Sequence, residues 1–161
     1  MEKTFKRDVC ALDAVFEFVN SFLSAQKVGE KVTYSIMLAV EELFTNLIKH
    51  NVKQHAAREK DAEKQGEGQH DPGAGEGGKN DISISLERDA EHLIVRLTDF
   101  GVEPSSIPEN EEIDIALPLQ ERKVGGLGIH LVRNLVDKLT YEYKDGNLSV
   151  TVIKSMENQD V

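Results

Sequence analysis

The chain has 161 residues and a formal net charge of −10 at pH 7, from 19 Lys and Arg against 29 Asp and Glu. That length suits one domain, which we expect to span residues 1–161. A chain this acidic is a poor non-specific binder of nucleic acid, because neutralising the phosphate backbone needs a basic surface, so we expect no direct contact with nucleic acid. We find no apolar run near the roughly 20 residues of a membrane span, and no secretory signal, so we expect no membrane contact and a cytoplasmic location.

The cysteine count limits the chemistry further. There is one cysteine, Cys10, so no disulfide can form within the chain. A reducing cytoplasm is the default for such a chain, and we expect Cys10 to be a small buried side chain rather than a reactive thiol.

Two segments in the first third of the chain have helical periodicity. The second, from about residue 30 to 51, is apolar over a wide arc, which is typical of a helix covered on more than one side. The first begins after Asp8, a predicted N-cap, and six of its residues follow the i, i+3, i+4 spacing: Leu12, Val15, Phe16, Val19, Phe22 and Leu23.

Residues 54–80 differ from the rest in composition. They contain no Val, Ile, Leu, Phe, Met or Tyr, and they hold half of the chain's 12 glycines. Such a stretch buries too little apolar surface to offset the entropy lost on ordering. We therefore expect a flexible low-complexity insert within one domain, whose first part, AAREKDAEK, could continue the preceding helix for a turn or two.

After the insert the hydrophobic period becomes two, which predicts strands. Ile82, Ile84 and Leu86 alternate with polar residues, and Leu93, Val95 and Leu97 do so after a turn, which predicts a hairpin. Near the C-terminus, Asp145-Gly146 separates two further alternating runs, a strong hairpin signal. A short strand at 3–6 could add an edge.

The segment between the two hairpins contains an acidic, Pro-containing loop or lid and then a short helix of about 127–137, with Leu131 and Val132 predicted to face inward. Hairpins with helices between them predict an α+β fold. We expect a two-layer sandwich, a mostly antiparallel sheet with helices on one face.

Three clusters interrupt the packing pattern. In the first, Glu42, Asn46 and His50 lie at i, i+4 and i+8, so they share one face of the second helix. Asn is unfavourable inside a helix, and burying unpaired polar groups is costly. The alternative is a solvated face, but because this helix is largely apolar, we favour a functional face.

The second cluster is Asp99-Phe100-Gly101, directly after a predicted strand. An Asp followed by Gly at a strand end is also an ordinary turn, and this alternative stays open. In the functional interpretation, the carboxylate faces a pocket and Gly101 lets a flat ligand approach the backbone.

The third cluster is Gly125-Gly126-Leu127-Gly128, at the start of the short helix. Free backbone N–H groups and the positive end of a helix dipole make an anion site that suits phosphate. No Gly-Lys-Ser/Thr follows and no parallel βαβ unit surrounds it, so it is neither a P-loop nor a dinucleotide fingerprint.

The order of the three clusters resembles the N, G1 and G2 boxes of the GHKL ATPases, which share the Bergerat ATP-binding fold. Within that superfamily the chain is most similar to the anti-sigma factor/serine-protein kinase family. AVEELFTNLIKHN, TDFGVEP and GGLGIHLVRNLVDKLTYEYKDGNLSVTVIK carry the resemblance. It covers nearly the whole chain except 54–80.

The resemblance implies roles for the first two clusters. Glu42 would position or deprotonate the attacking group, and Asn46 would hold Mg²⁺ beside the triphosphate of ATP. Asp99 would accept a hydrogen bond from the adenine amino group, and Gly101 would permit the approach of the ring.

The resemblance also implies a phosphate site and a lid. Residues 102–124 would form the ATP lid. The phosphates would contact Lys123 and the glycine-rich turn formed by Gly125, Gly126, Leu127 and Gly128.

The implied function is an ATP-dependent serine/threonine kinase that phosphorylates an anti-anti-sigma (STAS-domain) partner and sequesters a sigma factor or another target. A homodimer is a further expectation. Two features depart from the family pattern. One is the long insert, and the other is Glu103, which stands where the family more often has a small or apolar residue. These two departures leave open a non-catalytic, nucleotide-gated binding module.

The composition of the insert gives a first testable prediction. Replacing 54–80 by a short Gly/Ser linker should leave the Tm nearly unchanged, because this segment contributes no large apolar side chain to a core. Thermal unfolding followed by circular dichroism checks this, and a large drop in Tm would show that the segment packs on the domain.

Overall fold

The computed structural model describes residues 1–62, 81–102 and 126–156. Apart from Val102, the predicted lid at 102–124 lies outside the described residues, as do residues 63–80 of the predicted insert. The described elements are β1 (Glu2–Lys6), η1 (Val9–Ala11), α1 (Leu12–Ala25), α2 (Glu30–Ala62), β2 (Asp81–Arg88), β3 (His92–Phe100), α3 (Gly126–Leu135), β4 (Lys138–Lys144) and β5 (Asn147–Ser155).

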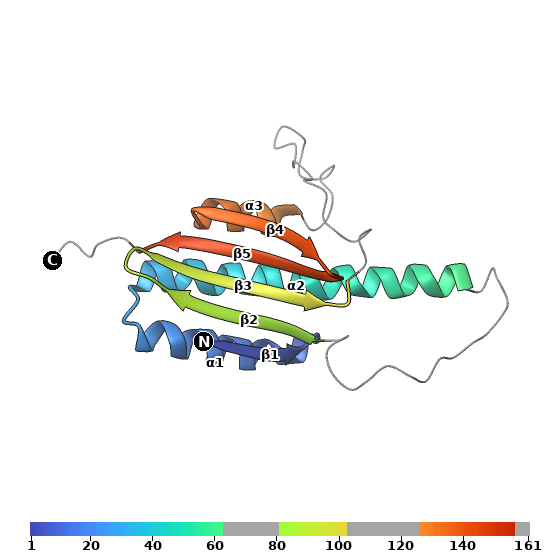
Figure 1. Cartoon of the computed structure of the whole chain (residues 1–161), viewed down its shortest axis with the longest axis horizontal. Coiled ribbons are helices and arrows are strands. Elements are labelled where there is room, and N and C mark those ends of the chain that lie inside the picture. Colours follow the sequence, from blue (N-terminus) through green and yellow to red (C-terminus); the bar gives the residue numbers. More distant parts are fainter. Residues whose placement is uncertain (63–80, 103–125, 157–161) are drawn as a thin grey trace.

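The strands form one antiparallel sheet in the order β1-β2-β3-β5-β4, and the helices lie together behind it in Figure 1. β2–β3 and β4–β5 are the two predicted hairpins, and the pairing of β3 with β5 joins them. β1 is the predicted edge strand. The α+β prediction, with an antiparallel sheet and helices on one face, is confirmed.

The turn between β4 and β5 follows from its two residues. Asp145 and Gly146 have φ values of 53° and 78°. A two-residue hairpin turn of this kind needs positive φ at both positions, which Asp tolerates and Gly adopts freely. The hairpin predicted from Asp145-Gly146 is therefore confirmed.

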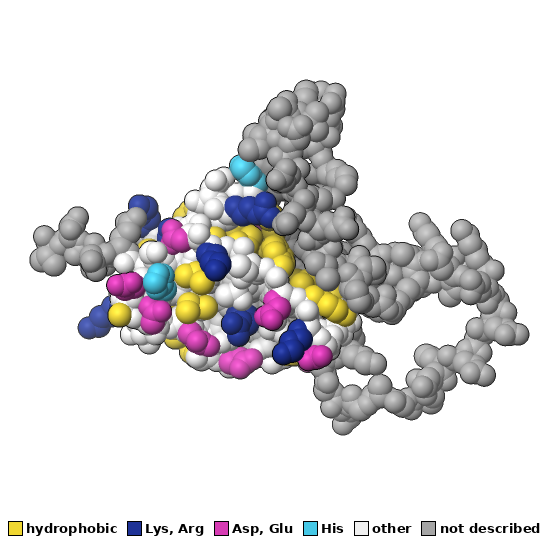
Figure 2. All heavy atoms as spheres, turned by 45° about the horizontal axis from the view of Figure 1, so that its top comes forward, with side chains coloured by type: hydrophobic (Ala, Val, Ile, Leu, Met, Phe, Trp, Pro, Cys, Tyr) yellow, Lys and Arg dark blue, Asp and Glu magenta, His cyan; other side chains and the backbone are white. Residues whose placement is uncertain are grey.

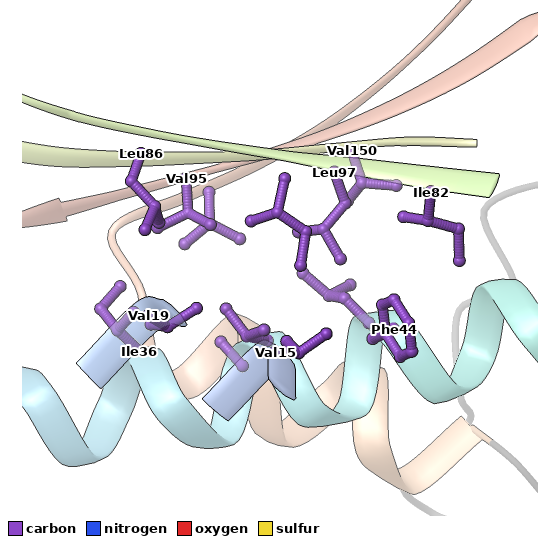
Figure 3. Close-up of a cluster of buried hydrophobic side chains, with 14 of the residues drawn as sticks. Val15, Val19, Ile36, Phe44, Ile82, Leu86, Val95, Leu97 and Val150 are labelled. Carbon is purple, nitrogen blue, oxygen red and sulfur yellow. The ribbon is translucent and has the colours of Figure 1, made fainter. Parts of the chain in front are cut away.

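The core lies between the inner face of the sheet and α1 and α2 (Figure 3). Strand alternation directs every second side chain toward the helices, so Ile84, Leu97 and Val150, which are neighbours across three strands, are all buried. The α1 side that meets the sheet consists of Val15, Phe18, Val19, Phe22 and Leu23.

Some helix boundaries differ from the prediction. α2 extends beyond about residue 51 to Ala62, in line with the expected continuation through AAREKDAEK, so residues 54–62 of the predicted insert are helical. A linker replacement that spares α2 is therefore confined to 63–80. α3 covers Gly126–Leu135 instead of about 127–137. Leu131, predicted to face inward, is 40% exposed, whereas Val132 is fully buried.

The predictions for Asp8 and Cys10 were wrong. The Asp8 side chain accepts a hydrogen bond from the Cys10 backbone N–H at 2.8 Å and so caps η1, not α1. Cys10 is exposed because it lies on this short surface turn. The pKa of the Cys10 thiol is raised, mainly by its hydrogen bond to the Asp8 side chain and secondly by the negative charge of Asp8. A raised pKa disfavours the reactive thiolate.

The surface shows how the charge is distributed. On the face in Figure 2, acidic and basic side chains are interspersed and do not gather into a patch of one sign. Within the described parts of the chain, we find no helix with the length and apolar character needed to cross a membrane.

Among the described residues, Phe44 is the largest fully buried side chain, and it packs beneath Ile82 and Leu97 (Figure 3). Phe44→Ala should destabilise the fold by about 3–5 kcal/mol, because it removes apolar burial and leaves a cavity. Tyr34→Ala is the matched control: Tyr34 lies on the same helix but is 66% exposed, so its loss should change stability by about 0.5 kcal/mol or less. Urea unfolding measures both, and equal effects would contradict the core assignment.

Candidate functional site

Two predicted site residues, Glu42 on α2 and Gly128 on α3, lie directly beside each other. A Cβ atom on Gly128 would overlap the Glu42 carboxylate oxygen Oε2 and lie 2.9 Å from Cδ. In this arrangement glycine leaves room for the carboxylate, and any larger residue would force the Glu42 side chain to move. The structure brings together the first and third sequence clusters at this point.

Asn46 lies one turn beyond Glu42 on α2. Its side-chain atom Nδ2 is buried and has no hydrogen-bond partner within the described residues. A half-turn of an amide exchanges its donor and its acceptor. In one orientation the group would donate to a phosphate oxygen, and in the other it would offer an oxygen to Mg²⁺. A buried amide without a partner suits such a ligand, because leaving it unpaired is costly.

Gly126 and Leu127 are the first residues of α3, followed by Gly128. The N–H groups of a first helical turn have no partner within the helix, and together with the helix dipole they favour an anion. Lys123 and Gly125 lie outside the described residues.

Asp99 lies on β3, two residues after the buried Leu97, so strand alternation directs it toward the helix layer. Its side chain is 3% exposed, and it forms an ion pair with the Arg7 guanidinium, which is 5% exposed. The Arg7 atom Nη2 donates to Asp99 Oδ1 and also to the Phe100 carbonyl oxygen at 2.9 Å.

The pKa of Asp99 reflects two opposing effects. Burial raises it above its usual value, and the charge and hydrogen bond of Arg7 lower it by less. The folded protein therefore binds this proton more tightly than the unfolded chain does. Asp99 is thus a buried carboxyl paired with a cation, not an exposed turn residue.

The backbone after Asp99 is held by the β4–β5 hairpin. Gly101 has a φ of 73°, a left-handed conformation that favours glycine. The Val102 N–H donates to the Gly146 carbonyl at 2.8 Å, and the Tyr143 hydroxyl donates to the Val102 carbonyl at 2.9 Å. Gly101 therefore has a conformational role in addition to the one predicted from ligand approach.

Core side chains lie between Asp99 on β3 and the polar residues Glu42 and Asn46 on α2. Asp99 is paired in register with Ile82, and the Ile82 side chain packs in the same cluster as Phe44 (Figure 3). Phe44 lies between Glu42 and Asn46 in the sequence. The end of β3 and the polar part of α2 are therefore linked through one part of the core.

Arg7 was missed by sequence reasoning. It follows a short edge strand and belongs to no motif, and its partner is 92 residues further along the chain. The available signal is a basic residue next to a predicted strand, and only the pairing of β1 with β2 and of β2 with β3 places it near Asp99.

A family model described as the histidine kinase-like ATPase domain matches residues 5–154. The chain therefore belongs to that family, which confirms the prediction of a GHKL ATPase and places the protein in a nucleotide-binding class.

Among solved structures, a chain of the SiaB–SiaC complex from Pseudomonas aeruginosa matches with a TM-score of 0.60 and 12% identity. The match covers 95% of this chain and 88% of that one. A likeness at this identity shows the shared fold. No curated protein sequence matches the chain.

The buried ion pair gives a stability prediction. Arg7→Met should destabilise the protein by about 3–5 kcal/mol at pH 7, because it leaves a buried carboxylate without its cation. Losing Arg7 removes the effect that lowers the pKa of Asp99, so this pKa rises further. As the pH falls through the raised pKa the carboxyl becomes neutral, and the loss of stability should shrink.

Urea unfolding at pH 7 and pH 4 tests this. The control is Lys6→Met, which removes the partner of Asp81 in an ion pair whose Lys6 side chain is 80% exposed. Its cost should be about 1 kcal/mol or less. Equal costs for the two variants, or no dependence of the Arg7→Met cost on pH, would contradict the assignment.

Proposed function

We propose that this protein is a regulatory serine/threonine kinase of the anti-sigma factor type. It would phosphorylate an anti-anti-sigma (STAS-domain) partner and sequester a sigma factor or another target when that partner is phosphorylated. The observation that carries the proposal is the contact of Glu42 with Gly128, because it sets a carboxylate against a helix N-terminus suited to phosphate.

The donor residues fit Mg-ATP, which would supply the phosphoryl group. Asn46 would hold Mg²⁺, an ion that usually keeps several waters and takes its other ligands from substrate phosphates. The N–H groups of Gly126, Leu127 and Gly128 would bind phosphate oxygens. Asp99 would accept a hydrogen bond from the adenine amino group, with Gly101 beside the ring.

Glu42 would act on the attacking group. It would accept the proton of a partner Ser or Thr hydroxyl as the hydroxyl oxygen bonds to the γ-phosphorus, while the bond from that phosphorus to ADP breaks. The proposed products are a phosphorylated partner and ADP. The contact with Gly128 keeps the Glu42 carboxylate beside the turn that would bind the phosphates.

The partner side of the proposal is supported by resemblance. The family motifs suggest a STAS-domain protein, and the structural neighbour is part of a two-protein complex. A homodimer and the lid at 102–124 also belong to this proposal. The second candidate is a non-catalytic, nucleotide-gated binding module, favoured by Glu103, since a carboxylate near the triphosphate could weaken its binding.

Separate substitutions of Glu42 and Asn46 distinguish the two candidates. Glu42→Ala should leave Mg-ATP binding largely intact but slow phosphoryl transfer by roughly 10²–10⁴-fold, the usual effect of losing a general base. Asn46→Ala should weaken Mg²⁺-dependent ATP binding, because it removes a metal ligand. Calorimetric ATP titration and transfer of radiolabelled phosphate to purified STAS-domain proteins measure the two effects.

Glu41→Ala is the matched control, because Glu41 is the neighbouring carboxylate on α2 and is exposed. It should change neither binding nor transfer. If wild type binds ATP but phosphorylates no partner, and Glu42→Ala still holds the partner in a nucleotide-dependent way, the gated module is the better description. If neither Glu42→Ala nor Asn46→Ala has an effect, both roles are wrong.

Base selectivity tests the role of Asp99. A carboxylate accepts from the 6-amino group of adenine, whereas guanine carries a carbonyl there, so the wild type should bind ATP with Mg²⁺ and not GTP. Asp99→Asn should weaken ATP binding by about 1.5–3 kcal/mol through loss of a charge-assisted hydrogen bond. Calorimetry with both nucleotides measures this, and equal affinities of wild type for ATP and GTP would reject the role.

A further inference from the structure

The Arg7–Asp99 pair is an unusual feature of the described core. Both side chains are almost completely buried, with 5% and 3% of their surfaces exposed. The pair of the neighbouring Lys6 with Asp81 contrasts with it, because the Lys6 side chain is 80% exposed. A buried ion pair is often no more stabilising than apolar residues of similar volume, because both charges lose their hydration. The pair is therefore weakly explained by stability alone.

The geometry of Arg7 gives a more specific reason for the pair. One nitrogen, Nη2, donates to Asp99 Oδ1 and to the carbonyl oxygen of Phe100. Arg7 thus contacts two successive residues at the end of β3, immediately before Gly101 adopts its left-handed conformation. The guanidinium fixes both the carboxylate and the backbone where the proposed adenine site begins.

We infer that Arg7 is a positioning residue for base recognition, which holds Asp99 as an oriented carboxylate whose second oxygen, Oδ2, accepts the 6-amino hydrogen bond of an adenine nucleotide. This inference rests on the proposed function, because it assigns Arg7 to the same nucleotide site. Arg7 acts through Asp99 and is not itself assigned a contact with the base.

The charge state of Asp99 decides which base it can recognise. An ionised carboxylate only accepts hydrogen bonds, so it pairs with a 6-amino group and is repelled by a 6-carbonyl. A protonated carboxyl can also donate, and it would then tolerate a 6-carbonyl. Burial alone favours the protonated form, and the Arg7 guanidinium opposes this. Loss of Arg7 should therefore relax selectivity as well as weaken binding.

The test uses the full chain with Mg²⁺ and two probes, ATP and inosine triphosphate, which differ at position 6 in carrying an amino group or a carbonyl. Calorimetry gives the ratio of the two Kd values for wild type, Arg7→Gln and Arg7→Lys. An unfolded fraction weakens both apparent affinities by the same factor. The ratio therefore reports recognition even where a variant is less stable.

Wild type should prefer ATP by about tenfold or more, as expected for a charge-assisted hydrogen bond. Arg7→Gln should reduce this preference by roughly tenfold, while Arg7→Lys, which keeps the charge, should retain most of it. Lys6→Gln, at the preceding residue, is the matched control and should leave the ratio unchanged. In an Asp99→Asn background, Arg7→Gln should have no further effect on the ratio, since the two residues act as a unit.

The outcomes separate the inference from the proposed function. If Arg7→Gln weakens ATP and inosine triphosphate equally, Arg7 has only a structural role and the inference is overturned, while the proposed function stands. If Arg7→Gln changes the ratio equally with and without Asp99→Asn, Arg7 does not act through Asp99. If wild type binds neither nucleotide, the proposed function fails, and the assignment of Arg7 fails with it.

Discussion

The approach of α3 to α2 at Gly128 is the contact on which the candidate site depends. A side chain at this position would occupy the space of the Glu42 carboxylate. With glycine here, the Glu42 carboxylate can lie directly against the first turn of α3, whereas a larger residue would force the Glu42 side chain to shift. A motif that the sequence indicates as an anion site thus also has a packing role, because its glycine leaves room for the Glu42 carboxylate.

A second constraint, strand alternation along β3, sets the position of Asp99. The period that buries Leu93, Val95 and Leu97 continues to Asp99, so a carboxyl group occupies a position on the inner face of the sheet. Burial there favours the neutral acid, and Arg7 supplies the opposing charge from the end of β1. The edge strand is thereby tied to the site, although it contributes one buried apolar side chain, Phe5, to the core.

The parts of the fold that could be predicted are those set by local patterns. Alternation and the Asp145-Gly146 turn indicate both hairpins because neighbouring residues decide these features. The continuation of α2 to Ala62 agrees with the expectation that AAREKDAEK extends the helix, because Ala, Arg, Glu and Lys favour a helix without apolar burial. The Arg7–Asp99 pair could not be predicted, since it depends on the alignment of three strands and joins residues 92 positions apart. Glu42 and Gly128 were each predicted from their motifs, but their contact required the packing of α3 on α2.

The position of Glu42 also bears on the choice between a kinase and a gated binding module. A carboxylate beside the first turn of α3 is favoured by the helix dipole in the nucleotide-free protein. A triphosphate bound to the same turn, as proposed, would be repelled by the carboxylate, and this repulsion would lower its affinity. A module that only bound nucleotide would gain from a neutral residue at this position. An enzyme that transfers a phosphoryl group needs a base there, because the attacking hydroxyl must lose its proton near the γ-phosphorus. Within the proposed function, the position of Glu42 beside Gly128 therefore supports phosphoryl transfer over nucleotide binding alone.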